Sequence, residues 1–320
     1  PMRRRGGMDR YVIPTLGDAV ACACNLIIDS CCDLPFEVVD REGVELINFP
    51  YIMEDGEHAD DLYQTTTAHD FFQATTSQVP IPVYQDAFKR AIDSGVPTVC
   101  LVFSSGLSGS YDAAELVYSQ MMEEHPDAEL YLVDTRLASV AEALLVHGAL
   151  RQREKGLSAK ELAQWAEEAR FFVDAEFMVD DLESLRRGGR IPSSVAYAGA
   201  KLDVKPLLTI GPDGKLSLSG VARGRKKGLK QLAEYFAKRV DDDGPIKYVV
   251  IGNADCPKDA ERLKDALSKI DDSILFLESS IGPVIGSHVG PGMIAVVFWG
   301  GDKREQLSVA DRIARRVKQG

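Results

Sequence analysis

A hydroxyl-rich loop is the strongest chemical signal in this sequence. Residues 104–110 read SSGLSGS, which places four serines and two glycines between an apolar run and a helical pattern. Glycine lets the backbone approach a ligand closely, and the free amides of a helix start favour an anion. The loop therefore predicts a site for an oxygen-rich anion such as a carboxylate or a phosphate. Capping of the helix by Ser108 or Ser110 explains the same residues without a ligand.

A single histidine in a glycine-rich segment is the second signal. Residues 285–292 read IGSHVGPG, so His288 stands among three glycines just before an apolar run. An imidazole can donate to an anion or act as a base, and glycines allow an unusual backbone path around it. We therefore expect a functional role for His288. The other histidines lie in helical or polar turn contexts without such company: His58, His69, His125 and His147.

A basic run in the second half of the chain permits two interpretations. Its cations could meet phosphate or an acidic partner. For Lys227 and Lys230 we favour the alternative without a binding role, namely the solvent-exposed start of a helix. The run consists of Arg223, Arg225, Lys226, Lys227 and Lys230.

Several motifs of catalysis are absent from the sequence. There is no Walker A motif, no complete G-x-G-x-x-G and no H-E-x-x-H. No G-x-S-x-G nucleophile elbow surrounds the candidate serines. ATP-binding, nicotinamide-binding and zinc-protease functions therefore lose their usual support.

The elements that must position these loops alternate in the first half of the chain. Apolar runs at 25–28, 44–53, 98–103 and 130–133 predict strands, and patterns at 68–75, 83–94, 111–124 and from about 139 predict helices. This order predicts an α/β fold, with a mostly parallel sheet and helices on both faces. Ligands of such sheets bind where strands end and loops lead into helices. Three such loops carry hydroxyls: Ser30, then Thr76 and Ser77, then Ser104, Ser105 and Ser108.

The second half mixes hairpins with helices, which predicts an α+β domain with a mixed or antiparallel sheet. Strands at 204–210 and 216–221 flank GPDG at 211–214, a hairpin signal. Further elements are expected as helices at 158–171, 226–240 and 257–270 and as strands at 247–252, 274–277 and 293–299. We therefore predict an N-terminal extension over 1–24, an α/β domain over 25–157 and an α+β domain over 158–320.

Composition excludes several classes of protein. The 320 residues are 45% hydrophobic, enough to bury a core rather than remain disordered. The net charge of -12 repels phosphate backbones and disfavours a nucleic-acid binder. No run of eighteen apolar residues occurs, so no membrane-spanning helix is expected.

The six cysteines and the N-terminal residues favour a cytoplasmic protein. Four cysteines fall within eleven residues and two lie far away, a spacing that fits no common zinc site or secreted disulfide framework. We expect reduced thiols and no metal. Residues 1–7 are basic, but Asp9, Arg10 and Asp18 interrupt the apolar stretch that an export signal requires. The cysteines are Cys22, Cys24, Cys31, Cys32, Cys100 and Cys256.

Taken together, five ordered segments resemble the DegV family. The order and spacing agree from about residue 25 to the end of the chain. Five segments in the same order are far more specific than any one of them. The segments are 29–35 (DSCCDLP), 76–78 (TSQ), 104–111 (SSGLSGSY), 185–191 (LRRGGRI) and 286–292 (GSHVGPG).

Two departures from the family pattern bear on the ligand pocket. The family often shows Ser-x-Gly-x-Gly near the fifth helix, whereas residues 139–143 read SVAEA and lack both glycines. It also usually shows Ser-Gln-Pro-Ser, whereas SQVP at 77–80 shifts the proline. Both changes are expected to alter the shape of the pocket and the chain length that it prefers.

The resemblance implies a two-domain carrier rather than an enzyme. Such a protein holds a long-chain fatty acid for a separate ATP-dependent kinase subunit, which phosphorylates the carboxylate, and the acyl phosphate feeds phospholipid synthesis. No cofactor is implied. By analogy Thr76, Ser105 and His288 would surround the carboxylate, with Ser77, Ser104 and Ser108 nearby and Arg190 and Arg223 at the head-group rim or the kinase docking surface.

Two other functions remain open at the level of sequence. An acyl hydrolase or transferase could use Ser105 as nucleophile and His288 as base, if the two lie within hydrogen-bond reach. A regulatory or scaffolding protein that binds another small acid is the second alternative.

Overall fold

A parallel sheet of four strands forms the first layer of the computed structural model, which describes residues 22–63, 73–192, 203–241 and 247–305. Its strands lie in the order β2-β1-β6-β7, and each neighbouring pair is parallel. The inner strand β6 is buried along its whole length, as parallel strands covered on both faces usually are. The strands are β1 (Asn25–Asp29), β2 (Val44–Ile47), β6 (Thr98–Val102) and β7 (Leu130–Asp134).

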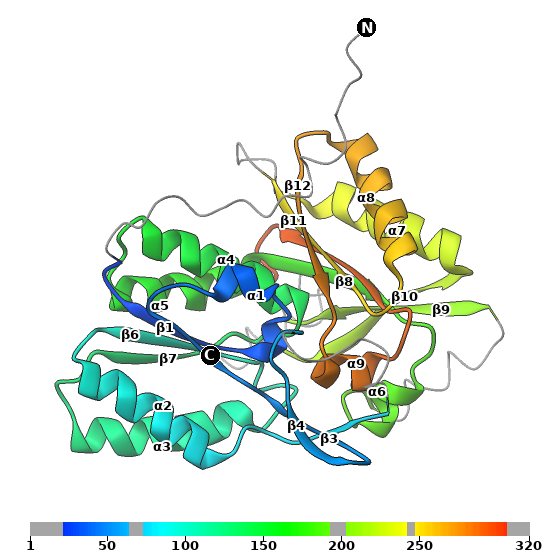
Figure 1. Ribbon diagram of the computed structural model, residues 1–320. Coiled ribbons are helices and arrows are strands. Elements are labelled where there is room, and N and C mark those ends of the chain that lie inside the picture. Colours follow the sequence, from blue (N-terminus) through cyan, green and yellow to red (C-terminus); the bar gives the residue numbers. More distant parts are fainter. Residues whose placement is uncertain (1–21, 64–72, 193–202, 242–246, 306–320) are drawn as a thin grey trace, which may run out of the picture.

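Helices cover both faces of this sheet (Figure 1). α2 and α3 pack together on one face, and α5 packs on β6 and β7 from the other. A capping box between Ser158 and Glu161 fixes the start of α5. The predicted parallel sheet with helices on both faces is thereby confirmed. The helices are α1 (Phe36–Val39), α2 (Ile81–Ser94), α3 (Ser110–Glu124), α4 (Val140–Glu154) and α5 (Ala159–Ala169).

A mixed sheet of six strands forms the second layer, in the order β10-β9-β8-β13-β11-β12. Only the pair of β11 and β12 is parallel among these neighbours. α7 and α8 cover one face, whereas α4 packs on β8, β11 and β13. The elements are β8 (Val173–Met178), β9 (Val204–Ile210), β10 (Leu216–Arg223), β11 (Tyr248–Asn253), β12 (Leu275–Ser280), β13 (Ile294–Trp299), α7 (Arg225–Arg239) and α8 (Pro257–Ile270).

Side chains of β13 show how the second sheet divides the core. Val296 and Phe298 belong to the apolar cluster under α7 and α8. Ala295 and Val297 point the other way, into the cluster shared with the first domain. The face of the sheet that is turned toward α4 therefore carries Ala295 and Val297, which line a pocket.

A small antiparallel sheet joins the two layers near the head of that pocket. β5 pairs with β3, and α9 packs on both strands. This packing brings residue 76 next to residue 288, which lies 212 positions later in the chain. The elements are β3 (Pro50–Met53), β4 (Gly56–Ala59), β5 (Thr75–Thr76), α6 (Glu183–Arg187), α9 (Pro283–Val289) and the short 3-10 turns at Ser30–Cys32 and Arg170–Phe172.

Three local predictions differ from the structure. The apolar run at 44–53 is two strands, because the chain leaves the first sheet after Ile47 and enters the small sheet at Pro50. The glycine-rich segment around His288 is the helix α9 rather than a loop, and its glycines with positive φ follow the helix. The helix expected at 68–75 lies mostly outside the described residues, and Thr75 is in β5. The proposed domain bounds remain a prediction.

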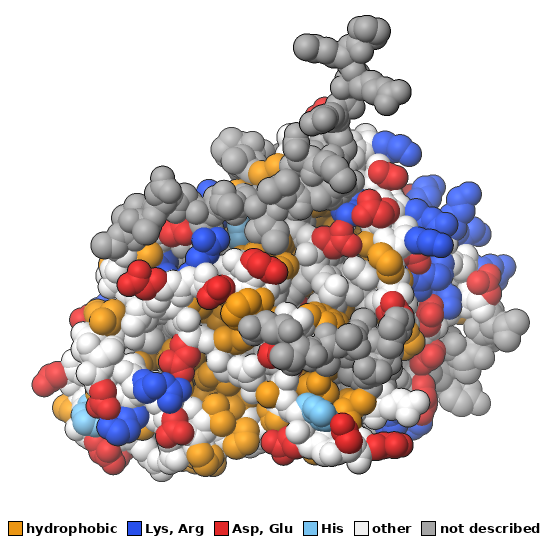
Figure 2. Space-filling view, in the orientation of Figure 1, with side chains coloured by type: hydrophobic (Ala, Val, Ile, Leu, Met, Phe, Trp, Pro, Cys, Tyr) orange, Lys and Arg blue, Asp and Glu red, His pale blue; other side chains and the backbone are white. Residues whose placement is uncertain are grey.

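The surface distribution of charge is uneven (Figure 2). Basic side chains gather on the flank formed by α7 and α8, where the basic run seen in the sequence lies. Lys227 and Lys230 are exposed there, in keeping with a solvated helix start. None of the helices within the described ranges is long and apolar enough to cross a membrane.

The cysteines and acidic residues form no metal site in the parts of the chain that the structure describes. No disulfide links the six cysteines, all of which lie within the described ranges. Burial raises the pKa of the Cys31, Cys32 and Cys100 thiols well above their ordinary value, so these three are unreactive core residues.

Candidate ligand-binding site

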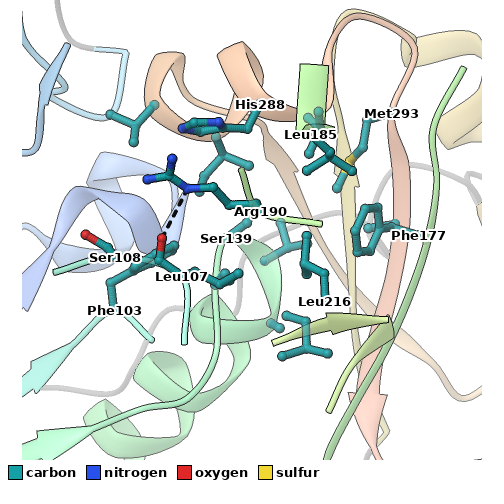
Figure 3. A pocket seen from close by; sticks show the side chains of 18 of the residues that line it. Phe103, Leu107, Ser108, Ser139, Phe177, Leu185, Arg190, Leu216, His288 and Met293 are labelled. Atoms are coloured by element: carbon teal, nitrogen blue, oxygen red, sulfur yellow. Dashed lines mark hydrogen bonds between the residues drawn. The ribbon is translucent and has the colours of Figure 1, made fainter. Parts of the chain in front are cut away.

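A pocket lies between the second sheet and the helices α4, α6 and α9 (Figure 3). It encloses about 740 Å³ of space between protein atoms, part of it open to solvent. Apolar side chains make most of its wall, and six residues with polar side chains lie among them: Thr76, Ser77, Ser108, Ser139, Arg190 and His288. The apolar lining comprises Phe49, Phe103, Leu107, Ala138, Val140, Ala141, Ala175, Phe177, Leu185, Ile210, Leu216, Val284, Ile285, Val289, Met293, Ala295 and Val297.

Thr76 and His288 meet at the head of this pocket. The Thr76 hydroxyl and Nε2 of His288 lie 2.8 Å apart, within hydrogen-bond distance. Burial, together with the charges of Arg190 and Arg187, lowers the pKa of His288 to about 4. The imidazole is therefore neutral at physiological pH. The same positive field that disfavours a proton on His288 favours an anion beside it.

Arg190 supplies much of that field. Its Nε donates to the Leu107 carbonyl at 3.2 Å, and Nη1 donates to the Gly188 carbonyl. Within the described ranges no carboxylate forms an ion pair with Arg190, and burial lowers its pKa. A half-buried guanidinium held only by carbonyl groups keeps its charge available to a ligand.

A glycine makes room for the histidine ring. A Cβ added to Gly188 would lie 2.3 Å from His288 Nδ1, a distance that no real contact allows. The backbone of Gly188 is helical, with φ of -73°, so the residue is needed for space rather than for backbone freedom. Of the two glycines in the 185–191 segment, Gly188 therefore makes room for the imidazole, whereas Gly189 has a positive φ of 72° and nothing close to its Cβ position.

Ser108 is the serine of the hydroxyl-rich loop that reaches the pocket. Its hydroxyl lies 3.0 Å from that of Ser110, which accepts a hydrogen bond from the Val79 amide at 3.0 Å. This chain of contacts ties the loop to the segment that carries Thr76 and Ser77. The structure therefore brings together five of the eight residues selected from the sequence: Thr76, Ser77, Ser108, Arg190 and His288.

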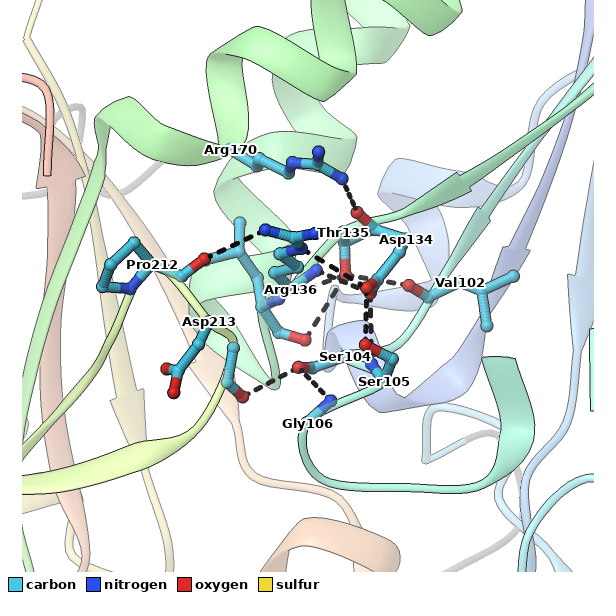
Figure 4. A network of polar contacts seen from close by, with 12 residues as sticks. Val102, Ser104, Ser105, Gly106, Asp134, Thr135, Arg136, Arg170, Pro212 and Asp213 are labelled. Atoms are coloured by element: carbon cyan, nitrogen blue, oxygen red, sulfur yellow. Dashed lines mark hydrogen bonds and ion pairs between the residues drawn. The ribbon is translucent and has the colours of Figure 1, made fainter. Parts of the chain in front are cut away.

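Ser104 and Ser105 lie outside the pocket lining and hold the two domains and the loop in place (Figure 4). Ser104 donates to the Gly214 carbonyl at the tip of the β9–β10 hairpin, at 2.8 Å. Ser105 is exposed and donates to Asp134 Oδ2 at 2.6 Å, at the end of β7. Without a ligand, the hydroxyl that the sequence suggests for the carboxylate is therefore bound to Asp134, outside the pocket lining. Arg223 is exposed at the end of β10, also outside the pocket lining.

Ser105 and His288 do not form a catalytic pair in the described structure. Ser105 donates to a carboxylate, and the Nε2 of His288 is engaged with Thr76. A nucleophilic serine needs a base within hydrogen-bond reach, and here the base has another partner. The geometry therefore does not favour the hydrolase alternative.

Several lining residues carry no signal in the sequence. Phe177 and Ala175 belong to β8, a strand that the sequence pattern does not predict because Asp174 and Glu176 interrupt its apolar run. Ser139 and the two residues after it, Val140 and Ala141, also line the pocket. The departure from the family pattern at 139–143 therefore falls on the pocket wall, where we expect it to narrow the space for a ligand.

Comparison with known proteins identifies the family. The model of a family described as an uncharacterised protein family, DegV, matches residues 23–300. A DegV domain-containing protein of Clostridium perfringens is 33% identical over 285 residues, which cover 87% of this chain and 98% of the relative.

Solved structures share the fold along nearly their whole length. A fatty-acid-binding DegV family protein from Thermus thermophilus is 26% identical, with a TM-score of 0.75, and the match covers 87% of this chain and 100% of that one. A stearic-acid-binding protein from Eubacterium ventriosum is 25% identical, with a TM-score of 0.74 and coverage of 89% and 100%.

Proposed function

Because the chain belongs to the DegV family, we propose that its pocket binds a long-chain fatty acid. The observation that carries this proposal is a pocket with a mostly apolar wall, in which Thr76, His288 and Arg190 lie close together at one end. The Thermus thermophilus and Eubacterium ventriosum proteins that share the fold are described as binding fatty acid and stearic acid.

The carboxylate belongs at the polar head. A buried carboxylate must receive hydrogen bonds, since desolvation without them is costly. While the Thr76 hydroxyl and the neutral His288 imidazole stay bonded to each other, the pair has one hydrogen left to donate. The Ser108 hydroxyl can donate a second hydrogen bond, and Arg190 provides a positive field at the rim. Ser108 takes the place that the sequence suggested for Ser105.

The tail belongs in the apolar part of the pocket. Burying about fourteen methylenes at ~0.8 kcal/mol each gives a gross gain of about 11 kcal/mol, before the cost of ordering the chain. Phe177 of β8, Ile285 of α9 and Met293, the residue before β13, would contact it. Affinity thus comes mainly from the tail, and the head group fixes the orientation.

The finer part of the proposal is that a separate ATP-dependent kinase subunit phosphorylates the bound fatty acid. A carboxylate oxygen attacks the γ-phosphorus, ADP leaves, and an acyl phosphate forms that can feed phospholipid synthesis. Support comes from the open head of the pocket, where Ser77 and Arg187 are exposed and Thr76 and His288 are partly exposed. A carboxylate held there can be reached from outside.

Titration with matched ligands tests the fatty-acid site. Stearic acid is expected to bind at least about tenfold more tightly than stearyl alcohol, because only the acid carries a charged hydrogen-bond acceptor. Equal affinities would contradict a carboxylate at the Thr76–His288 end. Absence of binding by both ligands would remove the proposed function altogether.

Replacing Gly188 by alanine is expected to weaken stearic acid binding by about tenfold while the fold persists. The added Cβ would lie 2.3 Å from His288 Nδ1, so the ring must shift, which disturbs its contact with Thr76. Isothermal titration beside thermal melts of ligand-free protein measures both effects.

The matched control for that variant is Gly220→Ala, whose Cβ would meet Leu207 at an ordinary 3.7 Å outside the pocket lining. This control should bind stearic acid as the wild type does. Unchanged affinity in Gly188→Ala would show that the position of the imidazole is immaterial.

A further inference from the structure

The start of α9 is held by a buried carboxylate from the other end of the chain. The amide of Gly282, the residue before the helix, donates to Asp33 Oδ1 at 2.9 Å. Asp33 is 2% exposed and follows β1 in the DSCCDLP segment. Asp33 therefore holds the first turn of α9, the helix whose last turn carries His288.

The second oxygen of the same carboxylate holds the pocket wall. Asp33 Oδ2 accepts a hydrogen bond from the Ser139 hydroxyl at 2.5 Å. Ser139 lines the pocket, precedes α4 and has a φ of 54°, a left-handed conformation that costs energy in a residue other than glycine. Asp33 therefore bonds to two residues beside the ligand site: Ser139, which precedes α4, and Gly282, which precedes α9.

The space around Gly282 leaves α9 little freedom to shift. A Cβ at this position would lie 2.6 Å from Asp33 Oδ1 and 3.0 Å from Asp60 Oδ2. The helix start is thus enclosed between two buried carboxyl groups. Burial and the neighbouring Asp60 raise the pKa of Asp33, so its hydrogen bonds matter more than its charge.

We infer that Asp33 is a positioning residue for His288, acting through α9, and that the DSCCDLP segment therefore sets head-group recognition without touching the ligand. Asp33 does not line the pocket. Its loss would free the first turn of α9 and let His288 leave Thr76. The expected effect on ligand affinity rests on the proposed fatty-acid site, whereas the expected displacement of the His288 ring does not.

The test compares Asp33→Ala, Asp33→Asn and a buried control, Asp174→Ala. Asp174 is 1% exposed and bonds to Tyr235 and Arg239 on the far side of the second sheet. Asp33→Ala should lower the ratio of stearic acid affinity to stearyl alcohol affinity by about tenfold. Asparagine can accept a hydrogen bond from Gly282 and donate one to Ser139, so Asp33→Asn should keep this ratio of affinities. Asp174→Ala should also keep the ratio, even if the variant protein is less stable.

A double-mutant cycle and an apo readout separate positioning from general damage. In a His288→Ala background, Asp33→Ala should lower the ratio no further. In ligand-free protein, the imidazole NMR signals of His288 should shift in Asp33→Ala and stay in place in Asp174→Ala. If wild type binds no fatty acid but these signals shift, the proposed function fails and the positioning role stands.

An equal loss of acid and alcohol affinity in Asp33→Ala, an additive loss in the His288→Ala background, or unmoved His288 signals would overturn the inference. If Asp33→Ala does not fold, Asp33→Ser provides a side chain too short to reach Gly282, and it is compared with Asp33→Asn by the same measurements.

Discussion

Replacing Thr76 or His288 by alanine is expected to weaken fatty-acid binding by about 1.5–3 kcal/mol, which is roughly tenfold to a hundredfold in affinity. Each substitution breaks the Thr76–His288 pair, which is proposed to donate a hydrogen bond to the carboxylate, and leaves the apolar wall intact. The ligand-free fold should change less than the affinity, because both side chains are only partly buried. Titration with a fluorescent fatty acid, beside thermal melts of apo protein, measures the two quantities.

Ser105→Ala is the matched control for these variants. Its sequence position suggests a carboxylate contact, but its hydroxyl is bound to Asp134 outside the pocket lining. The affinity of Ser105→Ala for the fatty acid should stay within about twofold of wild type. The affinity of Ser108→Ala should decrease, as that of Thr76→Ala does. Affinity that drops in Ser105→Ala and survives in Ser108→Ala would contradict the assignment of the head group.

Acyl phosphate should form only when a cognate kinase subunit and ATP are both present. The expected effect is all or none, because the sequence has no Walker A loop and Ser105 has no histidine partner in the described structure. The measurement is incubation of the protein with labelled ATP and oleate, with and without the kinase subunit.

Two outcomes of that incubation would overturn the carrier role. Acyl phosphate formed by the protein alone would mean that the chain holds an ATP site of its own. Ester hydrolysis that disappears in Ser105→Ala would restore the serine hydrolase, and the same assay with His288→Ala would identify its base.

Local pattern was sufficient for much of the fold. The helix at 257–270 has the predicted bounds, because a proline at its first turn and an apolar stripe define it within one window of sequence. β8 is missed, since Asp174 and Glu176 read as solvent-facing residues. Their partners are Arg239 and Ser219, which lie more than forty positions away and are invisible to a local pattern.

The same limit applies to α9 and to the serines. Glycines around His288 suggest a loop, whereas packing against β3 and β5 stabilises a short helix there. Within SSGLSGS, nothing local decides which hydroxyl faces a ligand. That choice depends on Asp134, which ends the neighbouring strand 29 residues later and engages Ser105, while Ser108 remains in the pocket wall.

The most direct test of the fatty-acid site is the identity of what the protein carries. Purified protein from a bacterial host is denatured in organic solvent, and the extract is analysed by mass spectrometry against an equal amount of the Thr76→Ala, His288→Ala double variant. We expect wild type to release a long-chain fatty acid in near-stoichiometric amount and the double variant to release much less. Wild-type protein that is reproducibly lipid-free and binds no added fatty acid would contradict the proposed function.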